Sequence, residues 1–205
     1  MRLRLLGLVV VGLVFGALLA LAILPGAREQ LIARIEPLGV TSVGKASVGG
    51  PFTLTDHTGR RVTDKDFRGK YMLVYFGFTF CPDVCPTGLQ VMAAALEELG
   101  PKAEQIVPIF ISVDPERDTP EQLAMYVPSF HSRLVGLTGT PEEIQAVAKA
   151  YRVYYRKVKD EKSTAEYTID HTSIIYLMDP NGEFVAHFTH ATPVDVMVEK
   201  LRKVL

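Results

Sequence analysis

Cysteine is scarce in this 205-residue chain, and neither sign of charge predominates. The only two cysteines are Cys81 and Cys85, so the sequence excludes a scaffold held together by several disulfides. A bridge between residues so close together would restrain the unfolded chain only a little. With 22 basic and 23 acidic residues, the chain also lacks the positive excess that binding to a nucleic acid requires. These absences make the cysteine pair itself the candidate for chemistry.

The most extended apolar run lies near the N-terminal end and contains no charged residue. It extends from Leu5 to Leu24, follows Arg2 and Arg4, and is closed by Pro25. About 20 residues at ~1.5 Å each match a hydrocarbon core of about 30 Å. The apolar region of a cleaved signal peptide has only ~7–15 residues. We therefore predict a retained membrane anchor, although Ala20-Leu21-Ala22 would also suit a cleavage site.

The charges beside this run predict its orientation. Arg2 and Arg4 on its short N-terminal side favour a cytoplasmic N-terminus. The rest of the chain would then lie on the periplasmic, or extracytoplasmic, side of the inner membrane. No cysteine lies near the run, which excludes a lipid-modified N-terminal cysteine. We expect a single-pass anchor at residues 1–25, a tether at residues 26–47 and a folded domain at residues 48–205.

The folded domain is expected to contain a sheet. Apolar segments predict strands at Tyr71–Phe78, Ile106–Val113 and Ser173–Met178. The first two lack alternation, as is typical of central strands that are covered on both faces. Asn181-Gly182 predicts a tight turn that leads into an antiparallel strand at Phe184–Phe188.

Helices are predicted by one repeated pattern, a capping residue followed by proline in the first helical position. It occurs at Thr119-Pro120, Thr140-Pro141 and Thr192-Pro193. Cys85-Pro86 fits the same pattern, so we expect its cysteine to cap a helix that extends to about Leu99. This order of strands and helices predicts an α/β fold, a thioredoxin-like three-layer α/β/α sandwich.

The cysteine pair would therefore lie on a turn that faces the first amides of a helix. Unpaired amides and the helix dipole stabilise anionic sulfur there, and thiols so placed can have pKa values lowered to roughly 3.5–7.5. Two thiolates are too few for a closed zinc site, which typically has about four ligands. They suit Cu(I), and copper favours thiolate and imidazole. A redox nucleophile needs the same thiolate, so that use stays open.

A third ligand would come from the histidines. Four of the five have no position that argues for ligation: His57, His131, His187 and His190. His171 directly precedes the strand Ser173–Met178, and in a thioredoxin-like sheet the loop entering this strand faces the cysteine turn. Spacing alone leaves two interpretations of His171 open, a metal ligand or a partly buried histidine bonded to a main-chain carbonyl.

Three segments together resemble the Sco/SenC family of copper proteins. They are Phe78–Pro86, Ser112–Pro120 and Asp170–Thr172. The resemblance covers the chain from about Val48 onward, and it includes the plan of a membrane anchor followed by an exported thioredoxin-like domain.

The resemblance implies a ligand set and a function. It implies that Cys81, Cys85 and His171 bind Cu(I) or Cu(II). Family members help to deliver copper to the dinuclear centre of cytochrome c oxidase subunit II, and some are proposed to reduce the thiols of that centre. The implied partners are subunit II, other copper chaperones or thiol reductants, and the membrane through the N-terminal helix. We expect a metallochaperone rather than an enzyme.

Other functions stay open beside this one. A thiol–disulfide oxidoreductase would use Cys81 and Cys85 as a redox-active disulfide, but thioredoxin-type enzymes have C-x-x-C and no evident use for His171. A peroxiredoxin needs a threonine three residues before its cysteine, where this chain has Pro82. A structural or interaction module would leave the cysteine turn unexplained.

Acidic residues near the motifs have more ordinary interpretations. Asp83, between the cysteines, is expected to form a turn. Asp170 is a candidate to orient His171, because ligating imidazoles usually donate their second N–H to an acceptor. Asp114, Arg117 and Asp118 are expected to form a structured loop near the site without being ligands, and their charges are candidates to meet a partner.

Overall fold

The computed structural model describes residues 47–159 and 166–205. The predicted anchor and nearly all of the predicted tether lie outside these residues. Within the described part of the chain, no helix is long and apolar enough to cross a membrane.

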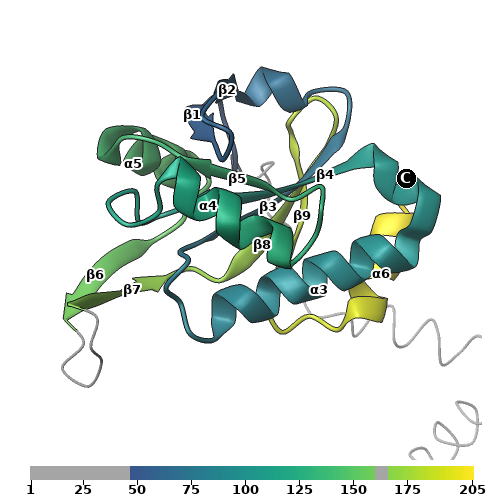
Figure 1. Cartoon of the computed structure of the whole chain (residues 1–205). Coiled ribbons are helices and arrows are strands. Elements are labelled where there is room, and N and C mark those ends of the chain that lie inside the picture. Colours follow the sequence, from purple (N-terminus) through teal and green to yellow (C-terminus); the bar gives the residue numbers. More distant parts are fainter. Residues whose placement is uncertain (1–46, 160–165) are drawn as a thin grey trace, which may run out of the picture. The chain divides into compact units, whose positions relative to one another are not determined.

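A seven-stranded mixed sheet runs through the folded domain, with the strand order β2-β1-β5-β4-β3-β8-β9 (Figure 1). Its strands are β1 Thr53–Asp56, β2 Arg61–Thr63, β3 Tyr71–Gly77, β4 Ile106–Ser112, β5 Val135–Thr138, β8 Ile174–Met178 and β9 Phe184–Thr189. Strands β3, β4 and β5 are parallel, and β8 pairs antiparallel with β3. The four predicted strands are confirmed as β3, β4, β8 and β9.

Helices cover both faces of the sheet. They are α3 Val84–Leu99, α4 Pro120–Tyr126, α5 Pro141–Ala150 and α6 Val194–Arg202, with short 3-10 helices η1 Asp64–Phe67, η2 Gly100–Gln105 and η3 Val127–Ser129. Helices α3 and α6 pack against each other on one face, and α4 lies on the same face, where a Cβ at Gly136 of β5 would touch its Leu123. Helix α5 lies on the other face (Figure 1). The predicted three-layer arrangement is confirmed.

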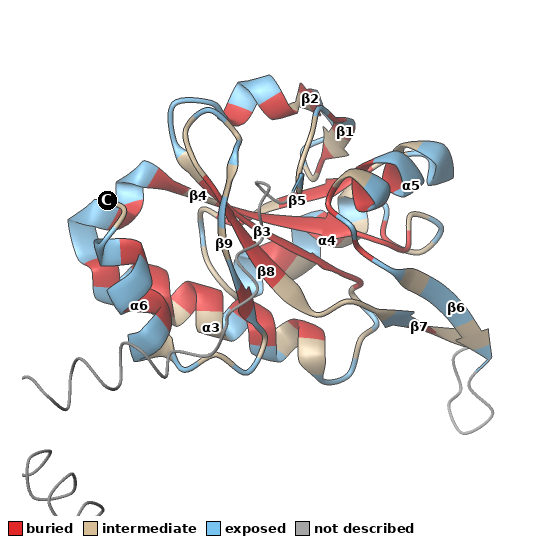
Figure 2. Cartoon of the chain, turned by 180° about the vertical axis from the view of Figure 1, so that it is seen from behind, coloured by how far each residue is buried: buried red, intermediate tan, exposed pale blue. Residues whose placement is uncertain are grey.

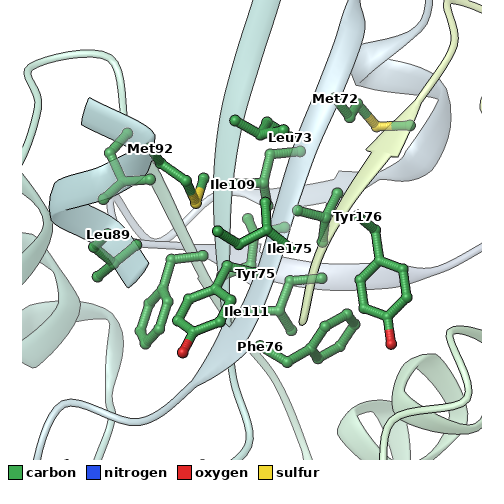
Figure 3. Packing of buried hydrophobic residues seen from close by; sticks show 14 of the residues in the cluster. Met72, Leu73, Tyr75, Phe76, Leu89, Met92, Ile109, Ile111, Ile175 and Tyr176 are labelled. Atoms are coloured by element: carbon green, nitrogen blue, oxygen red, sulfur yellow. The ribbon is translucent and has the colours of Figure 1, made fainter. Parts of the chain in front are cut away.

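The central strand β3 is buried on both sides because its successive side chains enter different layers. Tyr75 points toward α3 and lies near Leu89, whereas Phe76 points to the opposite face, where its ring is 5.2 Å from that of Tyr151 (Figure 3). Gly88 of α3 leaves room for the tyrosine, since a Cβ there would lie 3.0 Å from the Tyr75 ring. Red ribbon along β3 and β4 in Figure 2 shows this burial. Burial on two faces explains why the sequence of β3 does not alternate.

The predicted helix starts are confirmed at two threonines and shifted elsewhere. Thr119 and Thr140 cap α4 and α5, and the α5 cap forms a complete capping box with Glu143. Helix α6 begins one residue late, with Pro193 in the capping position. Helix α3 begins at Val84, so the prediction that Cys85 caps it is wrong.

Proline explains the shift at α3. Pro86 lies within the first turn, where amides have no acceptor inside the helix, so its missing N–H costs nothing there. Cys85 therefore belongs to the first turn of α3, and Cys81 lies on the turn before it. The helix ends at Leu99 as predicted, and Gly100 follows with φ of 58°.

The hairpin that precedes β8 was not predicted. Strands β6 Tyr155–Lys159 and β7 Tyr167–His171 pair as a separate two-stranded sheet. Three of the five residues of β6 are basic, so its sequence has no apolar alternation that would indicate a strand. This hairpin places His171 at the end of β7 and not in a loop.

Candidate metal centre

Three side chains from different elements converge at one end of the sheet. Cys81 comes from the turn after β3, Cys85 from the first turn of α3 and His171 from the end of β7. Their two Sγ atoms and one imidazole nitrogen all lie within 4.8 Å of one another. The Sγ atom of Cys85 is 3.3 Å from Nε2 of His171. Among residues 47–159 and 166–205, no other group of three His, Cys, Asp or Glu side chains meets in this way.

Close packing holds Cys85 in place. Its side chain is fully buried, and it lies beside Gly77, the last residue of β3. A Cβ at Gly77 would come within 2.7 Å of the Cys85 sulfur and 2.9 Å of the Phe110 ring. The hydroxyl of Tyr75 donates to the carbonyl of Val84 at 3.1 Å, which fastens the first turn of α3 to the sheet. A glycine at the end of a buried strand is the sequence signal for this close approach, and it was not among the predicted site residues.

Aromatic rings and one carbonyl orient His171. Its ring meets the rings of Phe78 and Tyr75 edge to face, with centroids 5.8 Å and 6.5 Å away. Its Nδ1 is 3.2 Å from the carbonyl oxygen of Thr172, so Nδ1 carries the proton and Nε2 presents a lone pair toward the cysteines. The predicted orienting role of Asp170 is wrong, because that side chain is exposed and the acceptor is the Thr172 carbonyl.

The two thiols differ in acidity because one is buried and the other is partly exposed. A hydrogen bond from Cys85 is the largest influence on Cys81 and lowers its pKa, against the effect of its own burial. Hydrogen bonds from the amides of Asp83 and Cys85 lower it further. The pKa of Cys85 is raised, first by its hydrogen bond to Cys81 and then by burial. The reduced pair therefore consists of a Cys81 thiolate and a Cys85 thiol, both free of disulfide.

This asymmetry predicts the pH dependence of alkylation. The pKa of Cys81 is lowered, so its thiolate is present above that low pKa and is lost only as the pH falls through it. Iodoacetamide should modify Cys81 at a nearly constant rate from about pH 8 down to about pH 6, whereas an ordinary thiol slows about tenfold per unit over this range. Mass spectrometry of the reduced, metal-free protein measures the rate. Cys85→Ala, which removes the main donor, should move the profile toward that of a free thiol. A wild-type profile like that of free cysteine would contradict the assignment.

The remaining histidines do not join the group. They are His57, His131, His187 and His190. His57 lies between β1 and β2, and its Nδ1 accepts a hydrogen bond from the amide of Gly136 at 3.2 Å. The Nδ1 of His131 accepts one from the amide of Arg133 at 3.1 Å. Asp83 is exposed and precedes α3, in agreement with its interpretation as a turn former.

A family model, SCO1/SenC, matches residues 40–205 of this sequence. The chain belongs to the SCO1/SenC family. The human protein SCO1 homolog, mitochondrial, is 49% identical over 164 residues, which cover 78% of this chain and 54% of the human one. The mitochondrial SCO1 homolog 1 of Arabidopsis thaliana is 48% identical over 163 residues, or 79% of this chain and 48% of that one. The chain thus spans about half the length of these curated relatives.

Solved structures of the family have the same fold. Arabidopsis thaliana ScoI with copper bound matches with a TM-score of 0.72 and 46% identity, over 77% of this chain and 98% of that one. BsSco, described as a member of the Sco family of cytochrome c oxidase assembly proteins with a disulfide switch, matches with a TM-score of 0.60 and 25% identity, over 78% and 95%. These likenesses confirm a thioredoxin-like α/β fold. The Cys-Cys-His group of this SCO1/SenC chain is a set of donors that could bind copper.

The side chains of Asp114, Arg117 and Asp118 in the loop after β4 turn inward, so their charges are not presented to a partner, whereas Glu116 of the same loop is exposed. The carboxylates of Asp114 and Asp118 are 0% exposed. Asp114 accepts hydrogen bonds from the guanidinium of Arg117 and from the hydroxyl of Tyr167, the latter at 2.8 Å. Arg117 also lies over the rings of Phe80 and Tyr167, 4.7 Å and 3.9 Å from their centroids. This side chain therefore connects the cysteine turn with the hairpin that carries His171.

Replacing Arg117 is expected to destabilise the domain. In Arg117→Met, the buried carboxylate of Asp114 loses its ion-pair partner, which typically costs about 3–5 kcal/mol. Urea unfolding of the reduced protein measures the loss. The matched control is Arg60→Met, because Arg60 is 77% exposed and its partner Asp56 keeps three other hydrogen bonds. That change should cost about 1 kcal/mol or less. Equal losses in the two variants would show that the Arg117 ion pair has no special weight.

Proposed function

We propose that this protein is a copper metallochaperone in which Cys81, Cys85 and His171 bind one copper ion. The convergence of their ligand atoms within 4.8 Å is the observation that carries the proposal. Two thiolates suit the soft Cu(I) ion, and the imidazole adds the nitrogen that Cu(II) prefers. The likeness to a ScoI structure with copper bound supports copper over other metals.

The protonation states of Cys81 and Cys85 determine how many protons are released when Cu(I) binds. Cys81 is already a thiolate, whereas Cys85 must lose its proton before its sulfur can bind the metal. Each Cu(I) bound should therefore release about one proton from the two sulfurs near neutral pH.

The burial of the three ligands indicates how copper would leave. Cys85 is buried, but Cys81 and His171 are partly exposed. An acceptor thiolate can approach from the side of Cys81, so transfer would proceed by ligand exchange through shared thiolates. We propose that the acceptor is the dinuclear copper centre of cytochrome c oxidase subunit II. The resemblance of the motifs and the description of BsSco as an oxidase assembly protein support this acceptor.

We further propose that residues 1–25 anchor the protein in the inner membrane and that residues 26–47 tether the domain of residues 48–205 on the extracytoplasmic side. The uncharged run from Leu5 to Leu24, behind Arg2 and Arg4, supports this arrangement. The intact mass of protein extracted from membranes tests it. A mass that lacks about the first 22 residues would show cleavage after Ala20-Leu21-Ala22, as in a signal peptide.

An anaerobic Cu(I) titration of the full-length reduced protein tests the main proposal. A competing chelator sets the free Cu(I) concentration, and one tightly bound equivalent is expected. The absence of competitive binding would overturn the chaperone function.

That outcome would favour a thiol–disulfide reductant that uses Cys81 and Cys85. The proximity of a thiolate to a second thiol supports this alternative, and BsSco is described as having a disulfide switch. Reversible oxidation in glutathione buffers, in a protein that does not bind Cu(I), would establish it.

A further inference from the structure

Asp118 is a buried carboxylate on which three hydrogen-bond donors converge. It lies in the loop between β4 and α4, and its side chain is 0% exposed. It accepts hydrogen bonds from the amide of Thr79 at 2.9 Å, the hydroxyl of Thr79 at 2.6 Å and the hydroxyl of Ser112 at 2.6 Å. Ser112 is the last residue of β4, so the carboxylate joins the sheet to the segment that follows the neighbouring strand β3.

That segment carries Cys81. Thr79 lies two residues before this cysteine, and the amide of Cys81 donates to the carbonyl of Phe78 at 3.2 Å. The next two residues, Pro82 and Asp83, are exposed. Through its hydrogen bonds to Thr79 and Ser112, Asp118 therefore links the start of the cysteine turn to the end of β4.

The two cysteines are held by different means. Cys85 is fixed by α3 and by its contacts with the end of β3. Cys81 is only partly buried, and its place depends on a turn anchored at Thr79. The separation of the two sulfurs is thus sensitive to the Thr79–Asp118 hydrogen bonds.

The location of Asp118 argues against a role in stability alone. Burial raises the pKa of its carboxyl despite the three hydrogen bonds, so ionising it inside the domain opposes folding. The nearest buried carboxylate, Asp114, has Arg117 as its partner, and its charge raises the pKa of Asp118 further. A buried carboxylate whose ionised form is disfavoured, and whose hydrogen bonds lead to a candidate site, is a candidate to serve that site.

We propose that Asp118 is a positioning residue for the metal centre: through Thr79 it holds Cys81 at the distance from which both sulfurs can bind one copper ion. The inference rests on the proposed copper function, because it concerns the geometry of the same site. Asp118 does not touch the ligands and acts only through the cysteine turn.

The test compares two substitutions of Asp118 in the full-length protein. Asp118→Ala removes every acceptor and should weaken Cu(I) binding about 10–100-fold, the usual cost of losing a group that orients a ligand. Asp118→Asn keeps the shape and an oxygen that can accept from Thr79, so its affinity should stay within about threefold of wild type. The competition titration measures affinity, and thermal unfolding measures stability.

A matched control separates positioning from general destabilisation. Asp56 is another buried carboxylate that accepts several hydrogen bonds within a turn, four of them from Thr58 and Arg60, but it lies on β1, beyond β5 and β4 from the cysteine turn. Asp56→Ala should lower stability and leave Cu(I) affinity unchanged. Equal affinity losses in Asp56→Ala and Asp118→Ala, or wild-type affinity in Asp118→Ala, would overturn the proposal.

A second readout needs no metal, so the positioning role and the copper function can fail separately. Amide hydrogen exchange of the reduced, metal-free protein reports the anchoring of the turn directly. Protection of the Thr79 and Cys81 amides should fall in Asp118→Ala and be retained in Asp118→Asn. If wild type binds no Cu(I), the copper function fails, and unchanged protection in Asp118→Ala would show that the positioning role fails as well. If wild type binds Cu(I) and protection is unchanged, only the positioning role fails.

Discussion

Either Cys81→Ser or Cys85→Ser should abolish tight Cu(I) binding. Each change replaces a soft thiolate by a hydroxyl and leaves one sulfur and one imidazole, which is too few soft donors for Cu(I). The loss should exceed the about 10–100-fold that removal of an orienting group costs, because a ligand itself is lost. Anaerobic competition against a Cu(I) chelator measures the affinity.

The two serine variants should differ in stability although both lose copper. Cys85 is fully buried beside Gly77 and Phe110, so a serine hydroxyl there must find a partner within the protein. Cys81 is partly exposed, and its serine stays in contact with solvent. Urea unfolding should show the larger loss for Cys85→Ser. Wild-type Cu(I) affinity in either variant would remove that cysteine from the ligand set.

Replacement of His171 should separate the two oxidation states of copper. In His171→Ala the two thiolates remain and can hold Cu(I), whereas Cu(II) loses the nitrogen donor that it prefers. The loss of Cu(II) affinity should exceed that of Cu(I) affinity by about tenfold or more, which is ~1.4 kcal/mol in binding free energy. Separate titrations with Cu(I) and Cu(II) measure it, and the Cu(II)–thiolate absorption band reports the site directly.

His131 provides the control for this experiment. It is also partly buried, but its Nδ1 accepts a hydrogen bond from the amide of Arg133 and it is not part of the Cys-Cys-His group. His131→Ala should leave both affinities unchanged. Equal losses of Cu(I) and Cu(II) affinity in His171→Ala would contradict the assignment of Cu(I) binding to the two sulfurs and of the Cu(II) preference to the imidazole.

Local patterns were sufficient to predict most of the fold. The apolar runs at β3 and β4 indicated buried central strands, and Thr-Pro pairs marked the starts of α4 and α5 within a residue. These signals work because capping and strand burial depend on residues close together in the chain. The start of α3 was misjudged because proline is tolerated at several positions in a first turn, so the pattern did not specify which one it occupies.

The hairpin β6–β7 shows where such patterns fail. Its first strand is basic and mostly exposed, so it is held by pairing with β7 and by contacts that its own sequence does not reveal. Lys157, for example, lies over the ring of Tyr167 and pairs with Glu116 of the distant charged loop. The position of His171 at the end of β7 could therefore not be derived from its spacing.

The sequence by itself determined the cysteine pair at a strand–helix junction, the thioredoxin-like order of elements and, through three motifs, the likeness to SCO1/SenC proteins. Only the tertiary structure decided how the site is assembled. In the folded domain, Nε2 of His171 lies 3.3 Å from the Cys85 sulfur. The acceptor of the imidazole proton is the Thr172 carbonyl and not Asp170. The side chains of Asp114 and Asp118 are buried. These contacts join residues up to 86 positions apart. They depend on the register of the sheet and on the packing of its layers, whereas helix caps and strand periodicity depend only on neighbours in the chain.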